Sequence, residues 1–311
     1  MRPAKLGFSL WSQATSWPAF RDAAVRIDAL GFDYLFTQDH LLATFGDEGQ
    51  DIYEGWTLIT AVAPLTSHVQ LGLLVAANTF RNPGLMAKAA VTLDHISNGR
   101  AVLGIGGAWH QPEHTAHGID FGVSPGDRLR RLDAAVRGMR ALLDGDAANV
   151  DEPSVRLPGV RHRPLPLAAR LPILVGGSGE QKTLLTTARY ADIWNGLGSV
   201  ETLRHKMAVL DAHCAAERRD PAEIERSVTV KMVIRDDPAE ARRVWEAALT
   251  ANRTRLDVEP DPWLGAPDMI AERARAYLAI GVTTVIVSMP NPYDTETIER
   301  LAREVQPLLA N

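Results

Sequence analysis

The chain has 311 residues, of which 46% are hydrophobic and 23% are charged, and a formal net charge of −5, as in ordinary globular proteins. No run of basic residues stands out, so nucleic acid is not the expected partner. No apolar run reaches about 18 residues, the length that a membrane span needs. Cys214 is the only cysteine, and the N-terminal residues lack the apolar core of a signal peptide. These features predict a soluble, cytoplasmic protein without disulfides, in which Cys214 is structural.

Short apolar, β-branched runs alternate with longer amphipathic segments along the chain. Strands are predicted at 6–10, 34–39, 69–75, 101–106, 172–177, 191–196, 227–234 and 283–289. Helices are predicted at about 16–30, 53–63, 83–96, 127–143 and 200–218. Another follows the strand at 172–177 and ends at about 190, two more lie between the strands at 227–234 and 283–289, and a closing helix ends at about 309. The segment 144–171 is rich in proline and charge and lacks periodicity, so we expect an excursion there rather than a core element.

Eight strand–helix units predict the α/β class and one (β/α)8 TIM barrel domain over residues 1–311, with an insertion at about 144–171 between strands 4 and 5. The nearly continuous apolar character of the strands is typical of parallel strands that are covered on both faces. A doubly wound Rossmann sheet is the competing architecture. It needs a glycine fingerprint at the first strand–helix turn, which here reads LWSQATS and has no glycine.

The active site of such a barrel lies at the C-terminal ends of its strands. His40 follows the second strand beside Asp39, where an imidazole can exchange protons near neutral pH. The alternative is a histidine that only hydrogen-bonds a loop. We therefore predict His40 as the catalytic residue.

The segment GGSGEQKT, residues 176–183, is the candidate anion site. Gly176, Gly177 and Gly179 would let backbone N–H groups point at one spot. Ser178 adds a hydroxyl donor, and the following helix adds its positive end. A glycine-lined tight turn is the alternative, and phosphate sites in barrels more often follow strands 7 and 8.

The segment GRAVLGIGGAWHQPEHTAHGIDF, residues 99–121, follows the fourth strand. Its glycines Gly104, Gly106 and Gly107 do not make a dinucleotide fingerprint, because Trp109 stands where another glycine is needed. Its possible metal ligands are His110, Glu113, His114 and His117. An HxxxH zinc motif requires a helix, and Pro112 lies inside this one, so no metal is expected. The segment is better interpreted as a glycine floor beside a large aromatic residue, on which a flat ring could rest.

Together these segments resemble the bacterial luciferase-like monooxygenase superfamily, in particular its actinobacterial F420-dependent oxidoreductases. The markers, in order, are LGFDYLFTQDHL, EGWTLITAVA, LGLLVAANTFRNPGLMAKAAVTLDHISNGRAVLGIGGAW, HTAHGIDF, PILVGGSGEQKTLLTTARYADIWN and IGVTTVIVS. The resemblance covers essentially the whole chain. It implies a barrel that binds the deazaflavin coenzyme F420 or, alternatively, FMN.

The resemblance also implies roles for individual residues. A non-prolyl cis peptide would fall around Val75, Ala76 and Ala77 and support the cofactor ring, and Asp39 would help to set the tautomer of His40. Close approach to the cofactor would be allowed by Gly106 and Gly107. The implied cofactor-binding residues are Ala76, Ala77, Asn78, Gly106, Gly107, Gly176, Gly177, Ser178 and Gly179.

One position departs from the sugar-phosphate dehydrogenases of the superfamily. Their catalytic glutamate lies just after the strand-4 glycines, where this chain has Trp109, so the oxidation of a sugar phosphate is not expected. His110 and Glu113 are possible substitutes, and Glu113 could equally be structural. An apolar, aromatic-lined substrate pocket is expected from Trp11, Phe45, Tyr53 and Trp109, which could instead pack the rim.

The expected reaction is hydride transfer between F420 and a small, apolar or aromatic organic substrate, because the cofactor carries such chemistry and the protein orients the reactants. One alternative is an FMN-dependent monooxygenase that uses reduced flavin and oxygen. Another is a barrel that binds a ligand without turnover. A homodimer is expected by analogy.

Overall fold

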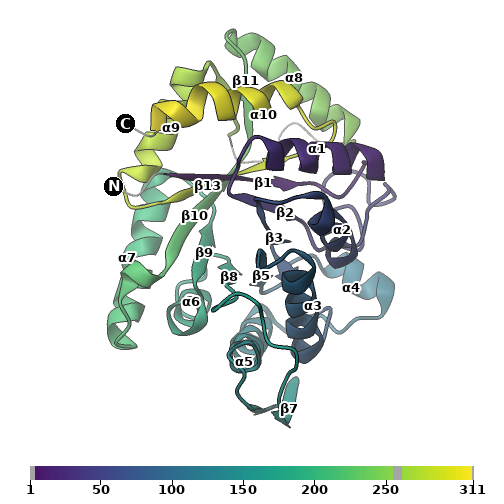
Figure 1. Ribbon diagram of the computed structural model, residues 1–311, viewed down its shortest axis with the longest axis vertical. Coiled ribbons are helices and arrows are strands. Elements are labelled where there is room, and N and C mark those ends of the chain that lie inside the picture. The colour runs from purple at the N-terminus through teal and green to yellow at the C-terminus, as the bar shows by residue number, and fades with distance from the viewer. Residues whose placement is uncertain (1–3, 255–260, 310–311) are drawn as a thin grey trace.

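A computed structural model describes residues 4–254 and 261–309. Within these residues, eight parallel strands close into a barrel, in the order β3-β2-β1-β13-β10-β9-β8-β5, with β5 pairing back to β3 (Figure 1). The strands are β1 (Lys5–Leu10), β2 (Tyr34–Thr37), β3 (Gln70–Leu73), β5 (Ala101–Gly106), β8 (Ile173–Gly176), β9 (Ile193–Gly196), β10 (Glu225–Val230) and β13 (Thr284–Met289). The predicted (β/α)8 TIM barrel is confirmed.

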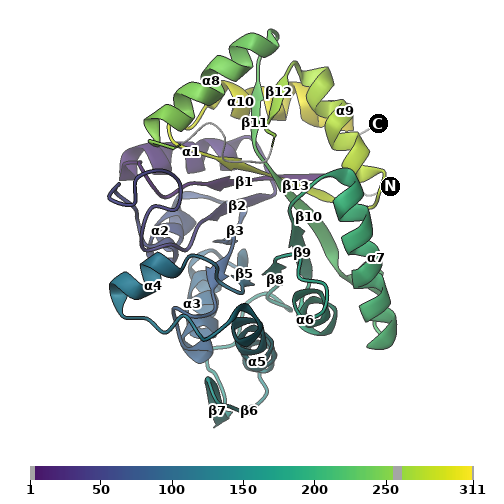
Figure 2. The same ribbon diagram turned by 180° about the vertical axis from the view of Figure 1, so that it is seen from behind.

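Helices surround the barrel strands and separate them along the chain (Figure 2). They are α1 (Trp17–Ala29), α2 (Gly55–Val62), α3 (Pro83–Ile96), α4 (Gln111–His117), α5 (Pro125–Leu143), α6 (Thr183–Tyr190), α7 (Val200–Ala216), α8 (Pro238–Ala251), α9 (Pro267–Leu278), α10 (Thr295–Arg300) and α11 (Gln306–Leu309). The predicted closing helix is interrupted by a π-helical turn at Leu301–Val305. Many helix starts follow from local sequence: Ser16, Asn82 and Ser124 cap helices that have a proline in the first turn.

Glycine allows β3 and β5 to close the barrel. A Cβ atom on Gly72 would lie 2.2 Å from the Val102 carbonyl oxygen, and one on Gly104 would lie 1.9 Å from the Leu73 carbonyl oxygen. Any side chain at these positions would therefore push the strands apart. One hydrophobic cluster, drawn from five of the barrel strands, comprises Tyr34, Phe36, Val102, Leu174, Ile193 and Ile286.

The seventh predicted strand, 227–234, is in fact two strands. β10 ends at Val230, and after Lys231 the chain continues as β11 (Met232–Ile234), which pairs with β12 (Trp263–Gly265) instead of with a barrel strand. This break places Lys231 directly after the C-terminal end of a barrel strand. Hydrophobicity alone could not show the break, because both pieces are buried.

The excursion at 144–171 contains an antiparallel hairpin, β6 (Ala148–Glu152) and β7 (Val155–Val160). It packs against α5, where a Cβ atom on Gly138 would lie 2.6 Å from Leu157 Cδ1. No strands were predicted from the sequence in this excursion, so the hairpin is a finding of the structure. The signal was present, because buried and exposed residues alternate at the start of both strands.

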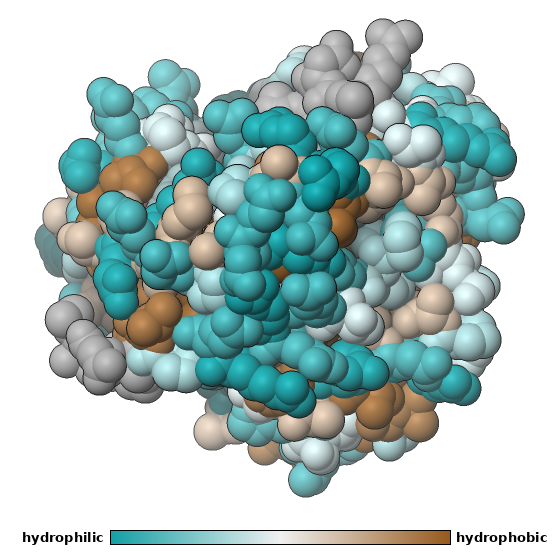
Figure 3. Space-filling view, turned by 90° about the horizontal axis from the view of Figure 1, so that it is seen from above, coloured by the Kyte–Doolittle hydropathy of each residue, from teal (hydrophilic) through white to brown (hydrophobic). Residues whose placement is uncertain are grey.

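Helix α4 was not predicted. We took Pro112 as a break, but it lies in the first turn of α4, where a missing N–H costs no hydrogen bond. None of the described helices is long and apolar enough to cross a membrane. The face in Figure 3 is mostly polar, and its hydrophobic residues are scattered among polar ones.

Candidate active site

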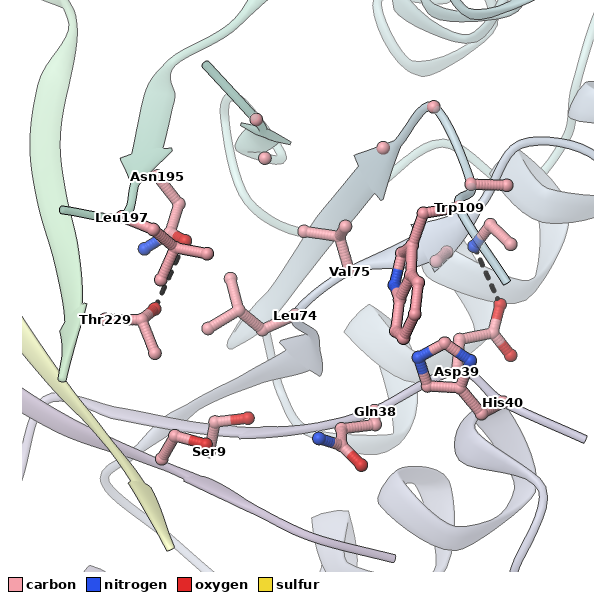
Figure 4. A pocket seen from close by; sticks show the side chains of 18 of the residues that line it. Ser9, Gln38, Asp39, His40, Leu74, Val75, Trp109, Asn195, Leu197 and Thr229 are labelled. Atoms are coloured by element: carbon pink, nitrogen blue, oxygen red, sulfur yellow. Dashed lines mark hydrogen bonds between the residues drawn. The ribbon is translucent and has the colours of Figure 1, made fainter. Parts of the chain in front are cut away.

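A cavity of about 620 Å³ opens at the C-terminal ends of the barrel strands (Figure 4). Its volume is that of a site for a small molecule or cofactor. In Figure 4, His40 and Trp109 lie on one side, Asn195, Leu197 and Thr229 lie on the other, and Leu74 and Val75 lie between them. The predicted residues that line it are Asp39, His40, Phe45, Ala76, Ala77, Gly106, Gly107, Trp109, Glu113, Gly176, Gly177 and Ser178.

A non-prolyl cis peptide bond joins Leu74 to Val75, between β3 and the short strand β4 (Ala76–Ala77). It lies at the start of the range that the family resemblance implied. The Val75 side chain fits against two glycines: a Cβ atom on Gly106 would lie 2.6 Å from Val75 Cγ2, and one on Gly176 would lie 2.8 Å from Val75 Cγ1. Gly106 and Gly176 therefore make room for the protein's own valine, and both glycines also line the cavity.

Glu113 on α4 holds the ring of His40. The Glu113 carboxylate lies 3.0 Å from His40 Nδ1 through Oε1 and accepts the Leu41 N–H at 2.8 Å through Oε2. Burial alone would raise the pKa of Glu113, but these hydrogen bonds outweigh it and the pKa is lowered. An ionised carboxylate only accepts, so Nδ1 carries a proton. His40 Nε2, on the cavity wall and without a hydrogen bond among the described residues, is left to exchange protons.

Asp39 does not set the tautomer of His40, contrary to expectation. Its carboxylate accepts two hydrogen bonds from Arg81, at 2.7 and 3.0 Å, and one from the Ala77 N–H at 3.0 Å. Burial raises the pKa of Asp39, and the Arg81 guanidinium opposes that effect. Neighbouring residues of an extended segment point to opposite sides, so Asp39 faces β4 while His40 faces Glu113. Asp39 thus positions β4.

The glycine segment after β8 retains unpaired donors. The Gly177 N–H donates to the Asn195 carbonyl at 3.1 Å, but within the described chain the N–H groups of residues 178–183 have no hydrogen-bond partner. Helix α6 begins there at Thr183 and has no side-chain cap, and Ser178 and Thr183 line the cavity. Lys206 Nζ donates to the nearby Glu180 carboxylate at 2.6 Å. This arrangement can hold an anion such as a phosphate group.

The aromatic residues divide into two groups. Phe45 and Trp109 line the cavity. Trp11 lies behind Phe45, with ring centroids 4.2 Å apart, and its Nε1 donates to Ser288 Oγ at 2.8 Å. The Tyr53 hydroxyl lies away from the cavity and accepts the N–H that begins α1. Trp11 and Tyr53 are not among the residues that line the cavity, and their polar atoms fix other segments.

Three further predicted residues are not among those that line the cavity. His110 lies beside Glu48, with Nε2 3.8 Å from the carboxylate. Asn78 is buried; its side-chain amide donates to the Arg128 carbonyl at 2.9 Å. Gly179 packs on Thr183. These residues support the walls and do not form them.

The histidines of α4 are committed to protein contacts. His114 Nδ1 lies 2.8 Å from the His110 carbonyl oxygen and Nε2 lies 2.7 Å from Thr79 Oγ1. His117 Nδ1 lies 2.8 Å from the Glu113 carbonyl oxygen. The described residues contain no cluster of three or more metal-ligating side chains.

Sequence reasoning missed several wall residues, among them Gln38, Thr229 and Lys231. Thr229 Oγ1 donates to Asn195 Oδ1 at 3.2 Å across neighbouring strands. The signal for Lys231 was a single charged residue inside the apolar run SVTVKMVI. The signal for Gln38 was its place two residues before His40, on the same side of an extended segment.

Comparisons with known proteins agree with this architecture. The family model for luciferase-like monooxygenases matches residues 5–287. An F420-dependent glucose-6-phosphate dehydrogenase of Kineococcus radiotolerans is 26% identical over 99% of this chain and 98% of its own. An FMNH(2)-dependent dimethylsulfone monooxygenase of Pseudomonas fluorescens is also 26% identical, over 96% of this chain and 89% of its own length.

Among solved structures, an F420-dependent secondary alcohol dehydrogenase in complex with an F420-acetone adduct superposes with a TM-score of 0.84 at 17% identity, covering 99% of this chain and 100% of that one. This likeness supports the barrel fold. The family match, which spans nearly the whole chain, confirms the resemblance found in the sequence. The chain belongs to the luciferase-like monooxygenase family, and it is an enzyme.

Proposed function

We propose that this enzyme transfers a hydride between coenzyme F420 and a small organic substrate with an apolar or aromatic body. The observation that carries the proposal is the His40–Glu113 pair, which leaves His40 Nε2 on the cavity wall without a hydrogen bond to any described residue. A hydride transfer to or from carbon–oxygen or similar bonds needs one proton donor or acceptor beside the reacting atoms. His40 supplies it.

The cavity fits a cofactor with a flat ring and a phosphate. Its floor is apolar at Leu74 and Val75, and the unpaired N–H groups of residues 178–183 lie beside cavity residues Ser178 and Thr183. When bound, F420 supplies two-electron hydride chemistry. Ser178 and the start of α6 would hold its phosphate, and the carboxylate of Glu113 would stabilise the positive charge that His40 acquires when Nε2 takes a proton.

An FMN-dependent monooxygenase is the second candidate. The same N–H groups suit the phosphate of FMN, and a relative with 26% identity is FMNH(2)-dependent. Glucose 6-phosphate is not the proposed substrate, because Trp109 replaces the glutamate expected there. Glu113, the nearest substitute, is committed to His40 and Leu41. We keep a cytoplasmic homodimer as part of the proposal; light scattering tests the dimer.

The deciding experiment titrates the purified protein with oxidised F420 and separately with FMN, following the absorbance of each. We expect F420 to bind, and Ser178→Ala to weaken binding several-fold by removing one donor to the phosphate. Ser124→Ala, which removes the cap of α5, is the matched control and should leave the affinity unchanged. Tight FMN binding without F420 binding would refute the first candidate in favour of the second.

A second experiment separates catalysis from binding. His40→Ala should lower turnover about 10²- to 10⁴-fold while changing the dissociation constant of F420 less than about threefold. The reason is that the phosphate donors belong to the 178–183 segment, whereas His40 bonds to Glu113 on α4. Equal losses in turnover and affinity would indicate that His40 only helps to bind the cofactor.

A further inference from the structure

Gln38 has an unexplained polar group in the cavity wall. Its side chain lines the cavity, its Oε1 is buried without a hydrogen-bond partner, and its amide makes no hydrogen bond to the described residues. Buried polar groups in folded proteins are almost always paired. The buried Oε1 is closed even to water, whereas the amide nitrogen is not among the buried atoms and no described residue bonds to it. The partner of this NH₂ group is therefore to be sought in the cavity.

The position of Gln38 relates it to the proton-exchanging residue. Gln38 and His40 lie along the same edge of the cavity in Figure 4, whereas the intervening Asp39 bonds to Ala77. Two other polar side chains in the wall, Asn195 and Thr229, bond to each other. The Gln38 amide and His40 Nε2 are thus neighbouring polar groups that can bind one substrate atom.

We propose that Gln38 is a specificity-determining residue and that, with His40, it holds the oxygen of a ketone or secondary alcohol substrate. The inference rests on the proposed function and adds the substrate class. The NH₂ group of a carboxamide donates hydrogen bonds, so it matches the oxygen of a carbonyl or hydroxyl group, each of which can accept one. The two nearby carboxylates, Asp39 and Glu113, are committed to protein donors and do not compete for this oxygen.

The reaction balances with these groups. In the direction of reduction, the carbonyl carbon receives a hydride with two electrons from the reduced deazaflavin, the C=O π pair moves to the oxygen, and His40 supplies a proton from Nε2. A ketone thus becomes a secondary alcohol, and the reverse steps oxidise the alcohol. Phe45 and Trp109, in the same cavity wall, would contact the apolar body of the substrate.

Two probes of equal shape test the inference: acetophenone and α-methylstyrene, in which a CH₂ group replaces the carbonyl oxygen. Binding is measured by tryptophan fluorescence and calorimetry. The protein is saturated with oxidised F420, with FMN if only FMN binds, or left cofactor-free if neither binds. We expect acetophenone to bind about tenfold more tightly, the effect of one hydrogen bond. Gln38→Leu should abolish that preference without changing the affinity for α-methylstyrene.

Gln70→Leu is the matched control. Gln70 Oε1 is also buried and unpaired, but Gln70 begins β3 at the opposite end of the barrel, so this variant should keep the preference. Gln38→Glu provides a second variant in case Gln38→Leu does not fold. Its ionised carboxylate cannot donate, so acetophenone should again lose its advantage.

The carbonyl stretch of bound ¹³C-labelled acetophenone reports the hydrogen bond directly. It should lie at lower frequency in the wild type and in Gln70→Leu than in Gln38→Leu. Equal affinities of the two probes for the wild type, absence of acetophenone binding, or a preference that survives in Gln38→Leu would overturn the inference. Failure of F420 to bind is a separate result that refutes the proposed function, because the probes are compared in every cofactor state.

Discussion

Replacing Glu113 by glutamine should reverse the tautomer of His40. In the wild type, Glu113 accepts from Nδ1 at 3.0 Å and from the Leu41 N–H at 2.8 Å. The glutamine oxygen can keep the bond to Leu41, but its NH₂ group then faces His40. Nδ1 must become an acceptor, and the proton moves to Nε2.

The magnitude follows from the burial and charge of Glu113. Its side chain is 1% exposed, and a hydrogen bond to a charged group contributes about 1.5–3 kcal/mol. At 1.36 kcal/mol for each factor of ten, the Nδ1–H tautomer is favoured by about ten- to 150-fold. Loss of this preference should lower turnover in the direction of alcohol oxidation by about 10²- to 10³-fold, because an Nε2 that already carries a proton cannot accept one from the substrate.

Histidine-labelled ¹⁵N NMR measures the tautomer without a substrate. At about pH 8, above the usual titration range of histidine, the two ring nitrogens have well-separated shifts that identify the protonated one, and His40→Ala assigns the signals. Glu48→Gln, a carboxylate-to-amide change beside His110, is the control and should leave His40 unchanged. An Nε2–H tautomer in the wild type, or an unchanged spectrum in Glu113→Gln, would refute the reasoning.

Three further outcomes are expected. The wild type should have a higher unfolding free energy than Glu113→Gln at pH 7, because the pKa of Glu113 is lowered in the folded state. This difference should shrink as the pH falls below the unfolded-state pKa of about 4.3 and through the folded-state pKa. Denaturation at several pH values measures it. Gly106→Ala should lower the free energy of unfolding in urea by about 1–3 kcal/mol, because the new Cβ atom would lie 2.6 Å from Val75 Cγ2. The control Gly126→Ala, whose nearest contact would be 3.5 Å, should leave the free energy of unfolding unchanged. Arg81→Met removes the cationic partner of Asp39 and leaves its carboxylate only the Ala77 N–H, which should cost about 3–5 kcal/mol in unfolding free energy at pH 7. The loss should be smaller at pH 4, where the buried carboxyl group takes up a proton, and a pH-independent loss would contradict this account.

The sequence predicted the barrel because its signal is local and repeated. Seven of the eight predicted strands correspond to single barrel strands, since strands covered on both faces are continuously apolar. The remaining one, 227–234, was predicted too long: β10 ends at Val230, a change of direction that no apolar pattern records. Likewise, a proline breaks the interior of a helix but is favourable in its first turn, where Pro112 lies.

For the site, the sequence placed His40 and the glycine segment after β8 at predicted strand ends, and His40, Gly176, Gly177 and Ser178 line the cavity. Tertiary structure decided the partners: Glu113 rather than Asp39 holds His40, and Gly106 makes room for Val75. The physical reason is that hydrogen bonds and close contacts join residues far apart in the chain, and their geometry depends on which side of each strand end a side chain faces. The hydrophobic pattern predicts where a strand lies, but only packing around the closed barrel determines which residues each side chain contacts.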